Sequence, residues 1–321
     1  GAAAYHTRRR KKEAGHIVSV ATEHRAVLDP LAELAKDGWK VTLVPVAGQA
    51  SPDAGRIDIA ALEAALRDET SLVSVMLANN EIGVIQPLEQ IAGLCKSRNI
   101  LLHTDAAQAV GKMPLDIKML GIDLVSFSGH KLYGPRGVGV LVTRRQRGKA
   151  PITAQLFGGR HQRGLRSGTL NVPGIVGLAR AMELANEELS TETSRLDRLR
   201  NRLFGGLQEQ IEGVVLNGPP LGDPSMRLAG NLNVQFRYVD GESLMLSTGG
   251  QVALSAGSAC TAAEPAPSHV LKALGLNDDA VRSSLRFGLG RFTTESEIDA
   301  TIKILAESVK RLRAMSSMTG Q

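Results

Sequence analysis

The chain has 321 residues, of which 43% are hydrophobic, 22% charged and only 3% aromatic, with a formal net charge of +6. This length allows one large domain and a smaller one, whereas so few aromatic residues argue against a nucleic-acid module built on base stacking. Only two cysteines occur, so we expect no disulfide framework and no CxxC metal site.

The first half of the chain alternates short apolar runs with helical patterns. The runs at residues 16–21, 41–46, 72–77, 100–104 and 122–127 predict strands, and the patterns at 26–37, 59–67 and 88–98 predict helices. Such alternation indicates an α/β fold with a mostly parallel, doubly wound sheet. The runs are apolar throughout, as expected for strands that are covered on both faces.

The second half has a different pattern. Residues 143–168 are rich in Gly, Arg and Gln and predict a loop, and residues 173–212 predict a long helix that links two domains. Strands are expected at 232–236, near 252–255 and at 284–289, and helices from 240, at 268–274 and from 294 to about 315. We therefore expect a large α/β domain at 1–172, followed by the linker helix and a smaller α+β domain at 173–321.

Two neighbouring predicted strands end in a carboxylate and an amine. Asp105 ends the run at 100–104, and Lys131 follows the run at 122–127 in a small, sharply turning segment. Ligands of open parallel sheets bind outside the carboxyl ends of the strands, and a Schiff-base lysine with an aspartate for a pyridinium nitrogen is the protein half of a pyridoxal phosphate (PLP) site. A helix-capping aspartate and a surface lysine are the structural alternatives. The pairing of the two residues favours an enzyme.

Further polar residues fall at the same kind of position. Gln108 and Asn80 could bond a ring oxygen, and Ser128 and His130 carry donors that suit a phosphate. His24 could stack on a flat cofactor and shuttle protons near neutral pH. Taken singly, a turn-forming asparagine or a structural histidine would explain these positions equally well.

The second half adds a thiol and a guanidinium. Cys260 lies in a run of small residues at 255–263, which predicts a mobile loop with an accessible, reactive thiol. Cys95 falls on an apolar helical face, and we interpret it as structural. Arg286 interrupts a predicted buried strand. Because a buried guanidinium needs a paired anion, we expect it to bind either a ligand carboxylate or a structural salt-bridge partner.

Together these segments closely resemble the cysteine desulfurases of the iron-sulfur cluster assembly type. These belong to the class V aminotransferase superfamily of fold type I PLP enzymes. The resemblance runs from about residue 16 to residue 313, and its most specific parts are 22–24, 79–83, 103–108, 126–135, 166–169, 257–261 and 283–294.

The resemblance implies a role for each matching residue. Lys131 would form the Schiff base with PLP, Asp105 would hold the pyridinium nitrogen, and His24 would stack on the ring. The ring oxygen would be bonded by Gln108 and Asn80. The phosphate would be bound by Ser128 and His130, and Thr169 would reach the phosphate at the site of a partner subunit in a homodimer.

The implied reaction removes sulfur from L-cysteine. Arg286, helped by Asn80, would hold the substrate carboxylate, and Cys260 would attack the sulfur as a thiolate, with His24 as a candidate base. The products would be L-alanine and a persulfide on Cys260, which is delivered to an iron-sulfur scaffold protein or other acceptors. No intrinsic metal is implied, although Cys260 could transiently ligate an iron-sulfur cluster together with a scaffold.

Departures from the family pattern leave alternatives open. The chain starts just after the position of the family's Gly-Ala-Thr-Glu-Ser phosphate-binding turn, so the large domain is expected to lack its N-terminal part. The alternatives are another class V enzyme, such as a selenocysteine lyase or aminotransferase, or a catalytically incompetent, scaffold-binding fragment. We expect a cytoplasmic protein, or a mitochondrial matrix protein whose targeting segment is not visible, with no nucleic-acid or membrane partner.

Overall fold

The computed structural model describes residues 1–2, 5, 15–144, 150–256 and 267–318. The chain forms two compact units. Unit 1 comprises Gly1–Pro45, Ile57–Ala78 and Gln86–Leu189, and unit 2 comprises Val46–Arg56, Asn79–Ile85 and Ser190–Gln321. The chain passes from one unit to the other within the 39-residue helix α6, Val172–Gln210, so part of the predicted linker helix belongs to each unit.

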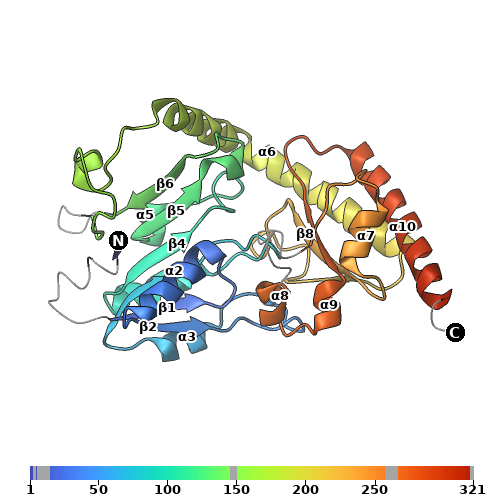
Figure 1. Ribbon diagram of the computed structural model, residues 1–321, viewed down its shortest axis with the longest axis horizontal. Helices are drawn as coiled ribbons and strands as arrows, with labels where there is room; N and C mark the ends of the chain where they lie inside the picture. The colour runs from blue at the N-terminus through green and yellow to red at the C-terminus, as the bar shows by residue number, and fades with distance from the viewer. Residues whose placement is uncertain (3–4, 6–14, 145–149, 257–266, 319–321) are drawn as a thin grey trace. The chain divides into compact units, whose positions relative to one another are not determined.

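Unit 1 is built on a six-stranded sheet in the order β2-β1-β3-β4-β5-β6 (Figure 1). Its first five strands run parallel to their neighbours, and β6 is antiparallel to β5. The predicted α/β fold with a mostly parallel sheet is confirmed. The strands are β1 (His16–Val20), β2 (Lys40–Val44), β3 (Thr70–Ser74), β4 (Leu101–Asp105), β5 (Leu124–Ser128) and β6 (Gly139–Thr143).

Helices connect the parallel strands, as such crossovers require. They are α2 (Arg25–Lys36), α3 (Ile59–Ala65), α4 (Leu88–Ser97) and the short α5 (Ile117–Leu120). Side chains fix three of these helix starts: Asp58 accepts the backbone N–H groups of Ala60 and Ala61, Asp116 caps α5 in the same way, and His24 caps α2. These caps satisfy N–H groups that have no partner inside a helix.

Burial along the sheet follows strand position. Every residue of the inner strand β1 is buried, whereas the edge strands β2 and β6 are largely exposed or half-buried. Strands covered on both faces need apolar residues at successive positions, which explains the uninterrupted run at β1. Trp39 packs with Ile17 and Leu31 in a core cluster beneath this part of the sheet.

Unit 2 contains a four-stranded antiparallel sheet in the order β7-β8-β10-β9. Its core is made of apolar residues from β8, β10, α6 and α10, with Phe236, Leu232 and Leu285 completely buried. The strands are β7 (Val214–Leu216), β8 (Asn231–Phe236), β9 (Ser255–Ala256) and β10 (Ser284–Gly288), and the helices are α7 (Gly241–Ser247), α8 (His269–Ala273), α9 (Asp278–Arg282) and α10 (Glu295–Met318).

The strand expected near residues 252–255 begins later than predicted. Within the described residues, β9 spans Ser255–Ala256 and pairs with β10 opposite Leu285 and Arg286. Gly249 and Gly250, which precede it, both adopt positive φ angles. This backbone conformation turns the chain instead of extending it.

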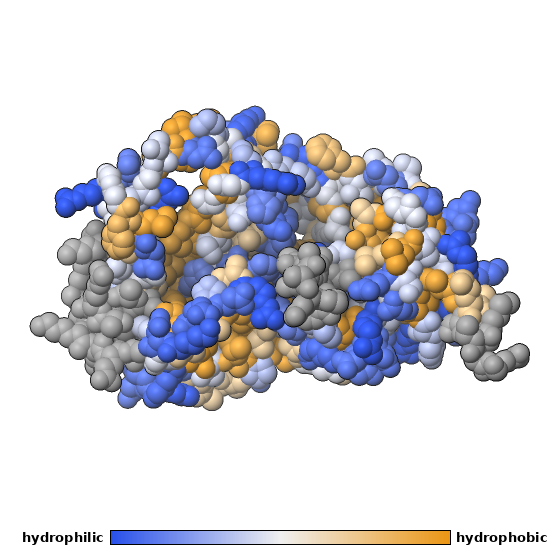
Figure 2. All heavy atoms as spheres, in the orientation of Figure 1, coloured by the Kyte–Doolittle hydropathy of each residue, from blue (hydrophilic) through white to orange (hydrophobic). Residues whose placement is uncertain are grey.

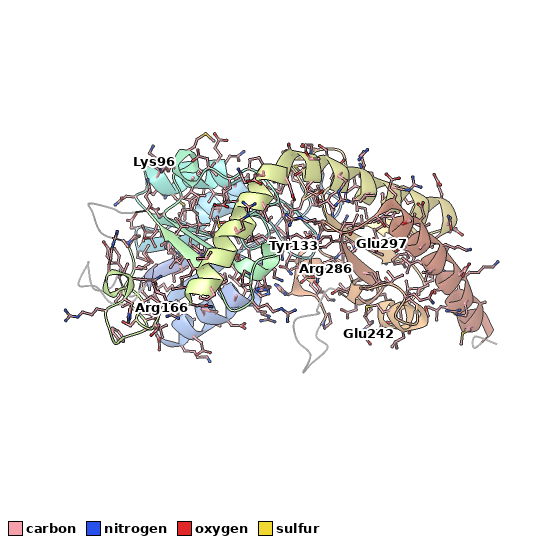
Figure 3. All side chains as sticks on the ribbon, turned by 90° about the horizontal axis from the view of Figure 1, so that it is seen from above. Lys96, Tyr133, Arg166, Glu242, Arg286 and Glu297 are labelled. Atoms are coloured by element: carbon pink, nitrogen blue, oxygen red, sulfur yellow. The ribbon has the colours of Figure 1, made fainter. Side chains whose placement is uncertain are left out.

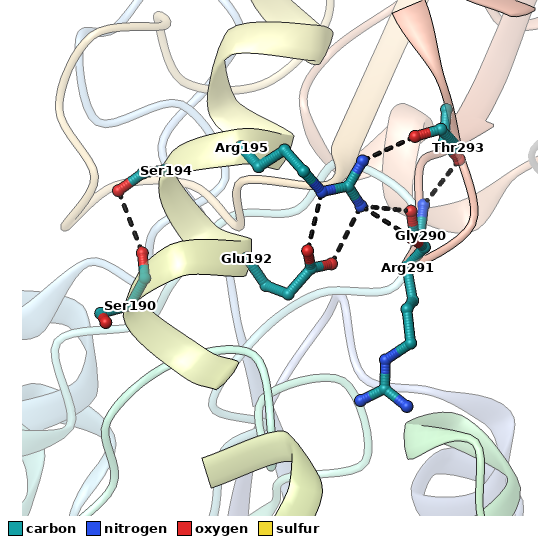
Figure 4. A network of polar contacts seen from close by, with 7 residues as sticks. All are labelled: Ser190, Glu192, Ser194, Arg195, Gly290, Arg291 and Thr293. Carbon is teal, nitrogen blue, oxygen red and sulfur yellow. Dashed lines mark hydrogen bonds and ion pairs between the residues drawn. The ribbon is translucent and has the colours of Figure 1, made fainter. Parts of the chain in front are cut away.

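Arg195 of α6 fixes the segment that follows β10 (Figure 4). Its guanidinium donates to the carbonyl oxygens of Thr293 (2.6 Å), Gly290 (3.0 Å) and Arg291 (3.0 Å), and it pairs with Glu192 at 2.7 Å. Both partners of this ion pair are three-quarters buried. The network therefore holds the end of the strand that carries Arg286.

Figure 2 shows a face on which hydrophilic side chains alternate with smaller hydrophobic groups. Among the helices of the described residues, none is long and apolar enough to cross a membrane.

Candidate functional site

The carboxyl ends of the parallel strands of unit 1 meet at one edge of the sheet. The strand order reverses between β1 and β3, which makes this point a topological switch of the kind where open α/β sheets bind ligands. Asp105 ends β4, while the segments that follow β1 and β5 carry His24 and Lys131. The structure thus brings most of the predicted cofactor-binding residues of unit 1 to the same edge.

Asp105 is the last residue of β4 and is held by backbone bonds on both sides. It pairs with Ser126 of β5, and its carbonyl oxygen accepts the N–H of Leu77 at 2.9 Å. Its Oδ1 accepts the N–H of Ala107 at 2.8 Å. The carboxylate is half-buried. These contacts fix its direction while leaving carboxylate acceptor capacity for a ligand.

Lys131 lies on a single 3-10 turn, Gly129–Leu132, directly after β5. The turn ends at Tyr133, which has a left-handed φ of 64° and is labelled in Figure 3. A Cβ on Gly129 would lie 3.1 Å from the carbonyl oxygen of Pro135, so a larger residue would require its neighbours to shift by a few tenths of an ångström. The amine is exposed on a backbone that is locally fixed.

The predicted phosphate ligands next to Lys131 differ in their surroundings. Ser128, the last residue of β5, is half-buried, and its side chain makes no capping bond to the turn. His130 is exposed on the turn itself. Thr169 is also exposed, in the loop that precedes α6 and contains Arg166, labelled in Figure 3. Their phosphate-binding roles remain predictions.

His24 has a defined tautomer. It is the N-cap of α2, and its Nδ1 accepts the backbone N–H of Ala26 at 3.1 Å. An accepting Nδ1 carries no proton, so the neutral ring has its proton on Nε2. The ring therefore offers an N–H donor at Nε2 while Nδ1 holds the cap.

Gln108 is oriented by Lys112, whose Nζ donates to Oε1 at 2.9 Å. Because the oxygen is used in this bond, the amide NH₂ is the donor group available to a ligand oxygen. The side chain is half-buried, and this orientation agrees with the predicted bond to a ring oxygen.

Two titratable groups at this edge were not predicted from the sequence, one of them buried and the other half-buried. Glu23 is completely buried, and its Oε1 accepts the N–H of Met76 at 2.6 Å. Burial, reinforced by the charge of Asp105, raises the pKa of Glu23 to about 8. The carboxyl thus joins the ends of β1 and β3 in its neutral form at neutral pH.

His103 is the second missed group. Its Nδ1 lies 2.8 Å from Ser74 Oγ and its Nε2 lies 3.0 Å from Ser126 Oγ, so the ring bridges β3 and β5. Burial lowers its pKa to about 4, which keeps the imidazole neutral. The only sequence signal was its place in the motif at 103–108, because nothing local marks a polar residue as buried.

Unit 2 brings Arg286 to Asn80. Arg286 lies on β10, and its Nη1 donates to the backbone oxygen of Asn80 at 2.9 Å, while Nη2 donates to Ser255 Oγ at 3.1 Å. Asn79 shapes the turn, because its Oδ1 accepts the N–H groups of Glu81 (2.8 Å) and Ile82 (3.0 Å). The two predicted substrate-binding residues are therefore neighbours (Figure 3 labels Arg286).

Of the two cysteines, the structure describes only Cys95. Cys260, the predicted nucleophile, lies outside the described residues. Cys95 is a buried free thiol on α4, and burial raises its pKa to about 12, which confirms its interpretation as structural. Within the described ranges, no three His, Cys, Asp or Glu side chains gather in a way that could hold a metal ion.

Comparison with known proteins places this site in a family. The class-V aminotransferase family model matches residues 1–301. The cysteine desulfurase IscS of Salmonella arizonae is 50% identical over 309 residues, which cover 96% of this chain and 73% of that protein.

Two solved structures agree with this assignment. A NifS-like protein is similar with a TM-score of 0.84 and 36% identity, covering 95% of this chain and 78% of its own. SspA in complex with cysteine is similar with a TM-score of 0.73 and 30% identity, covering 92% and 81%. The chain belongs to the class-V aminotransferase family, within its group of cysteine desulfurases.

Proposed function

We propose that the chain is a PLP-dependent enzyme that removes sulfur from L-cysteine, giving L-alanine and a persulfide on Cys260. The observation that carries the proposal is that Asp105 ends β4 and Lys131 follows the adjacent strand β5, with which β4 pairs in register. Family membership supports it, as does the similar solved structure of SspA in complex with cysteine.

The residues of unit 1 fit PLP by the chemistry of their donor set. Asp105 offers a half-buried carboxylate held by a backbone N–H, which suits a pyridinium nitrogen. Gln108 presents its amide donor, and His24 presents its imidazole ring, with Nδ1 bonded to the N–H of Ala26. Ser128 and His130 add a hydroxyl and an imidazole beside Lys131. Asn80 and Thr169 would complete the set, the latter at the site of a second subunit.

When bound, PLP would act as an electron sink for the bond-breaking at the substrate's α-carbon. Lys131 would hold the cofactor covalently and, once displaced by the substrate amine, move the α-proton as a neutral base. Arg286 would hold the substrate carboxylate through its two-pronged guanidinium. Its bond to the backbone of Asn80 fixes the guanidinium on one side.

The sulfur step is assigned to Cys260. Its thiolate attacks the substrate sulfur, the carbon–sulfur bond breaks with its electron pair left on the substrate carbon, and a sulfur–sulfur bond forms. Protonation of that carbon yields L-alanine, so that cysteine plus enzyme thiol become alanine plus enzyme persulfide. The thiolate is the reactive form of a cysteine, and the persulfide would be passed to an acceptor such as an iron-sulfur scaffold protein.

The two cysteines of the chain supply the test. Cys260→Ala should abolish sulfide release from L-cysteine, because the sulfur acceptor is lost, while the visible absorbance of bound PLP is retained. Cys95→Ala is the control, since Cys95 is buried in α4, and it should keep both properties. Unchanged sulfide release in Cys260→Ala would contradict the persulfide mechanism and favour another class V reaction.

A further inference from the structure

Three buried asparagines of unit 2 form a polar network that the proposed reaction does not use. Asn217 and Asn233 are 1% and 0% exposed, and Asn231 is 9% exposed. Asn231 and Asn233 both lie on β8, and their Nδ2 groups donate to the same acceptor, the backbone oxygen of Glu81, each at 3.2 Å. Two buried amides thus fix the position of a single backbone carbonyl.

Asn233 and Arg286 lie opposite each other in the sheet of unit 2. β8 and β10 are antiparallel, and their register pairs Asn233 with Arg286. Side chains of directly opposite residues in an antiparallel pair lie on the same face of the sheet. From this face, Arg286 Nη1 donates to the backbone oxygen of Asn80 at 2.9 Å. Asn233 donates to the backbone oxygen of the next residue, Glu81. The two side chains therefore hold successive carbonyls of one turn.

The orientation of the Asn233 amide follows from a chain of hydrogen bonds. Ser284 Oγ donates its proton to the backbone oxygen of Ala280 at 2.6 Å, so it accepts from Asn217 Nδ2, which lies 2.8 Å away. The same Nδ2 donates to Asn233 Oδ1 at 2.8 Å. Because its oxygen is bonded to Asn217, Asn233 turns its NH₂ group towards the oxygen of Glu81. A flipped amide would place oxygen against oxygen and NH₂ against NH₂.

We propose that Asn233, oriented by Asn217, is a positioning residue for the substrate carboxylate. It fixes the carbonyl of Glu81 and, with it, the turn to which the guanidinium of Arg286 is bonded. The inference deepens the proposed function, since it rests on the proposed role of Arg286. Without the Asn233 bond, the turn and the guanidinium gain freedom that is lost again when a carboxylate binds. The loss of affinity should therefore fall on ligands that carry a carboxylate.

Equilibrium dialysis of two labelled ligands against the PLP-loaded protein separates positioning from general stability. L-alanine, the proposed product, carries the carboxylate, and ethylamine is the same molecule without it. Asn233→Leu has a side chain of similar volume but no amide. It should bind L-alanine about tenfold more weakly than the wild type, an effect of the order of one hydrogen bond, and bind ethylamine equally well. In turnover, KM for L-cysteine should rise by the same factor, while kcat stays within about twofold.

Gln235→Leu is the matched control. Gln235 lies two residues further along β8, on the same face. It is half-buried, and its Nε2 donates to Ser283 Oγ at 3.0 Å instead of to the turn, so this variant should bind L-alanine as the wild type does.

Asn217→Ala is the second test variant. It removes the donor that orients Asn233 and leaves Asn233 itself in place on β8, so it should also weaken binding of L-alanine and not of ethylamine. In the double variant with Asn233→Leu the two losses should not add, because Asn217 acts through Asn233. If Asn233→Leu does not fold, the result for Asn217→Ala decides.

The outcomes distinguish the role of Asn233 from the proposed function. Weak L-alanine binding by Arg286→Gln, together with wild-type binding by Asn233→Leu and Asn217→Ala, overturns the role of Asn233 alone. Equal losses of L-alanine and ethylamine binding in the asparagine variants also overturn it, because such losses report a general structural defect. Unchanged L-alanine binding by Arg286→Gln overturns the proposed role of Arg286 and, with it, this inference.

Discussion

Glu23→Gln should remove a pH-dependent loss of stability from unit 1. Glu23 is fully buried, and burial raises its pKa from 4.5 to about 8. Between these values the folded chain keeps the proton that the unfolded chain gives up, so the free energy of unfolding falls as pH rises. The stabilisation by the neutral carboxyl is complete below 4.5, the pKa of Glu23 in the unfolded chain. It is lost as pH rises through about 8, the pKa in the folded chain.

The size of this loss in the free energy of unfolding follows from the two pKa values of Glu23, in the unfolded and in the folded chain. The loss is about 1.4 kcal/mol for each pH unit, or about 3 kcal/mol between the unfolded pKa and about pH 7. Glutamine keeps an oxygen for the N–H of Met76, whose bond to Glu23 is 2.6 Å long, but cannot ionise. The stability of Glu23→Gln relative to the wild type should therefore grow by about this amount over that pH range.

Urea unfolding followed by fluorescence measures this difference. The single tryptophan of the chain, Trp39, is buried in the core cluster of unit 1 and reports on that unit. Glu209→Gln, an exposed position near the end of α6, is the control and should follow the wild type. If wild type and Glu23→Gln lose stability in parallel as pH rises, Glu23 is ionised in the folded chain and the argument is wrong.

Three further predictions follow from the structure. Gly83→Ala should weaken both stability and cysteine binding, because a Cβ would lie 2.6 Å from Asn231 Oδ1 at a φ of +70°. Gly121→Ala is the control: it has the same φ but open space around the Cβ, so only the backbone strain remains. Equal losses of melting temperature in the two variants would contradict the steric argument. Asp105→Asn should lower PLP affinity in equilibrium dialysis, since the amide cannot balance a pyridinium charge; unchanged affinity would remove Asp105 from the cofactor site. Phe236→Ala should cost about 3–5 kcal/mol in urea unfolding, because Phe236 is completely buried; a cost below about 1 kcal/mol would mean that unit 2 repacks around the gap.

The inner strands and their helices were predictable because their apolar runs reflect burial on both faces. β1 is the clearest case, with five buried residues in sequence. β6 was missed as a separate strand, because an edge strand with exposed and half-buried positions carries no such run. α5 was missed for a related reason: it is a single turn without a buried residue, and its start depends on the local cap of Asp116.

The site was predictable where chemistry coincides with a strand end, as for Asp105 and Lys131. Glu23 and Glu81 were not recognised, since a glutamate in a sequence is expected to be solvated. Their burial comes from contacts with distant segments, namely Met76 for Glu23 and Ser268 for Glu81. The shifts in pKa that make them chemically distinctive arise only from that tertiary environment.

Detection of a persulfide on Cys260 tests the central claim most directly. The PLP-loaded protein is incubated with L-cysteine, and the peptide that contains Cys260 is examined by mass spectrometry without reduction. We expect the added mass of one sulfur atom on Cys260, formed together with L-alanine and absent from Lys131→Ala. Formation of L-alanine with no sulfur on Cys260 would contradict it.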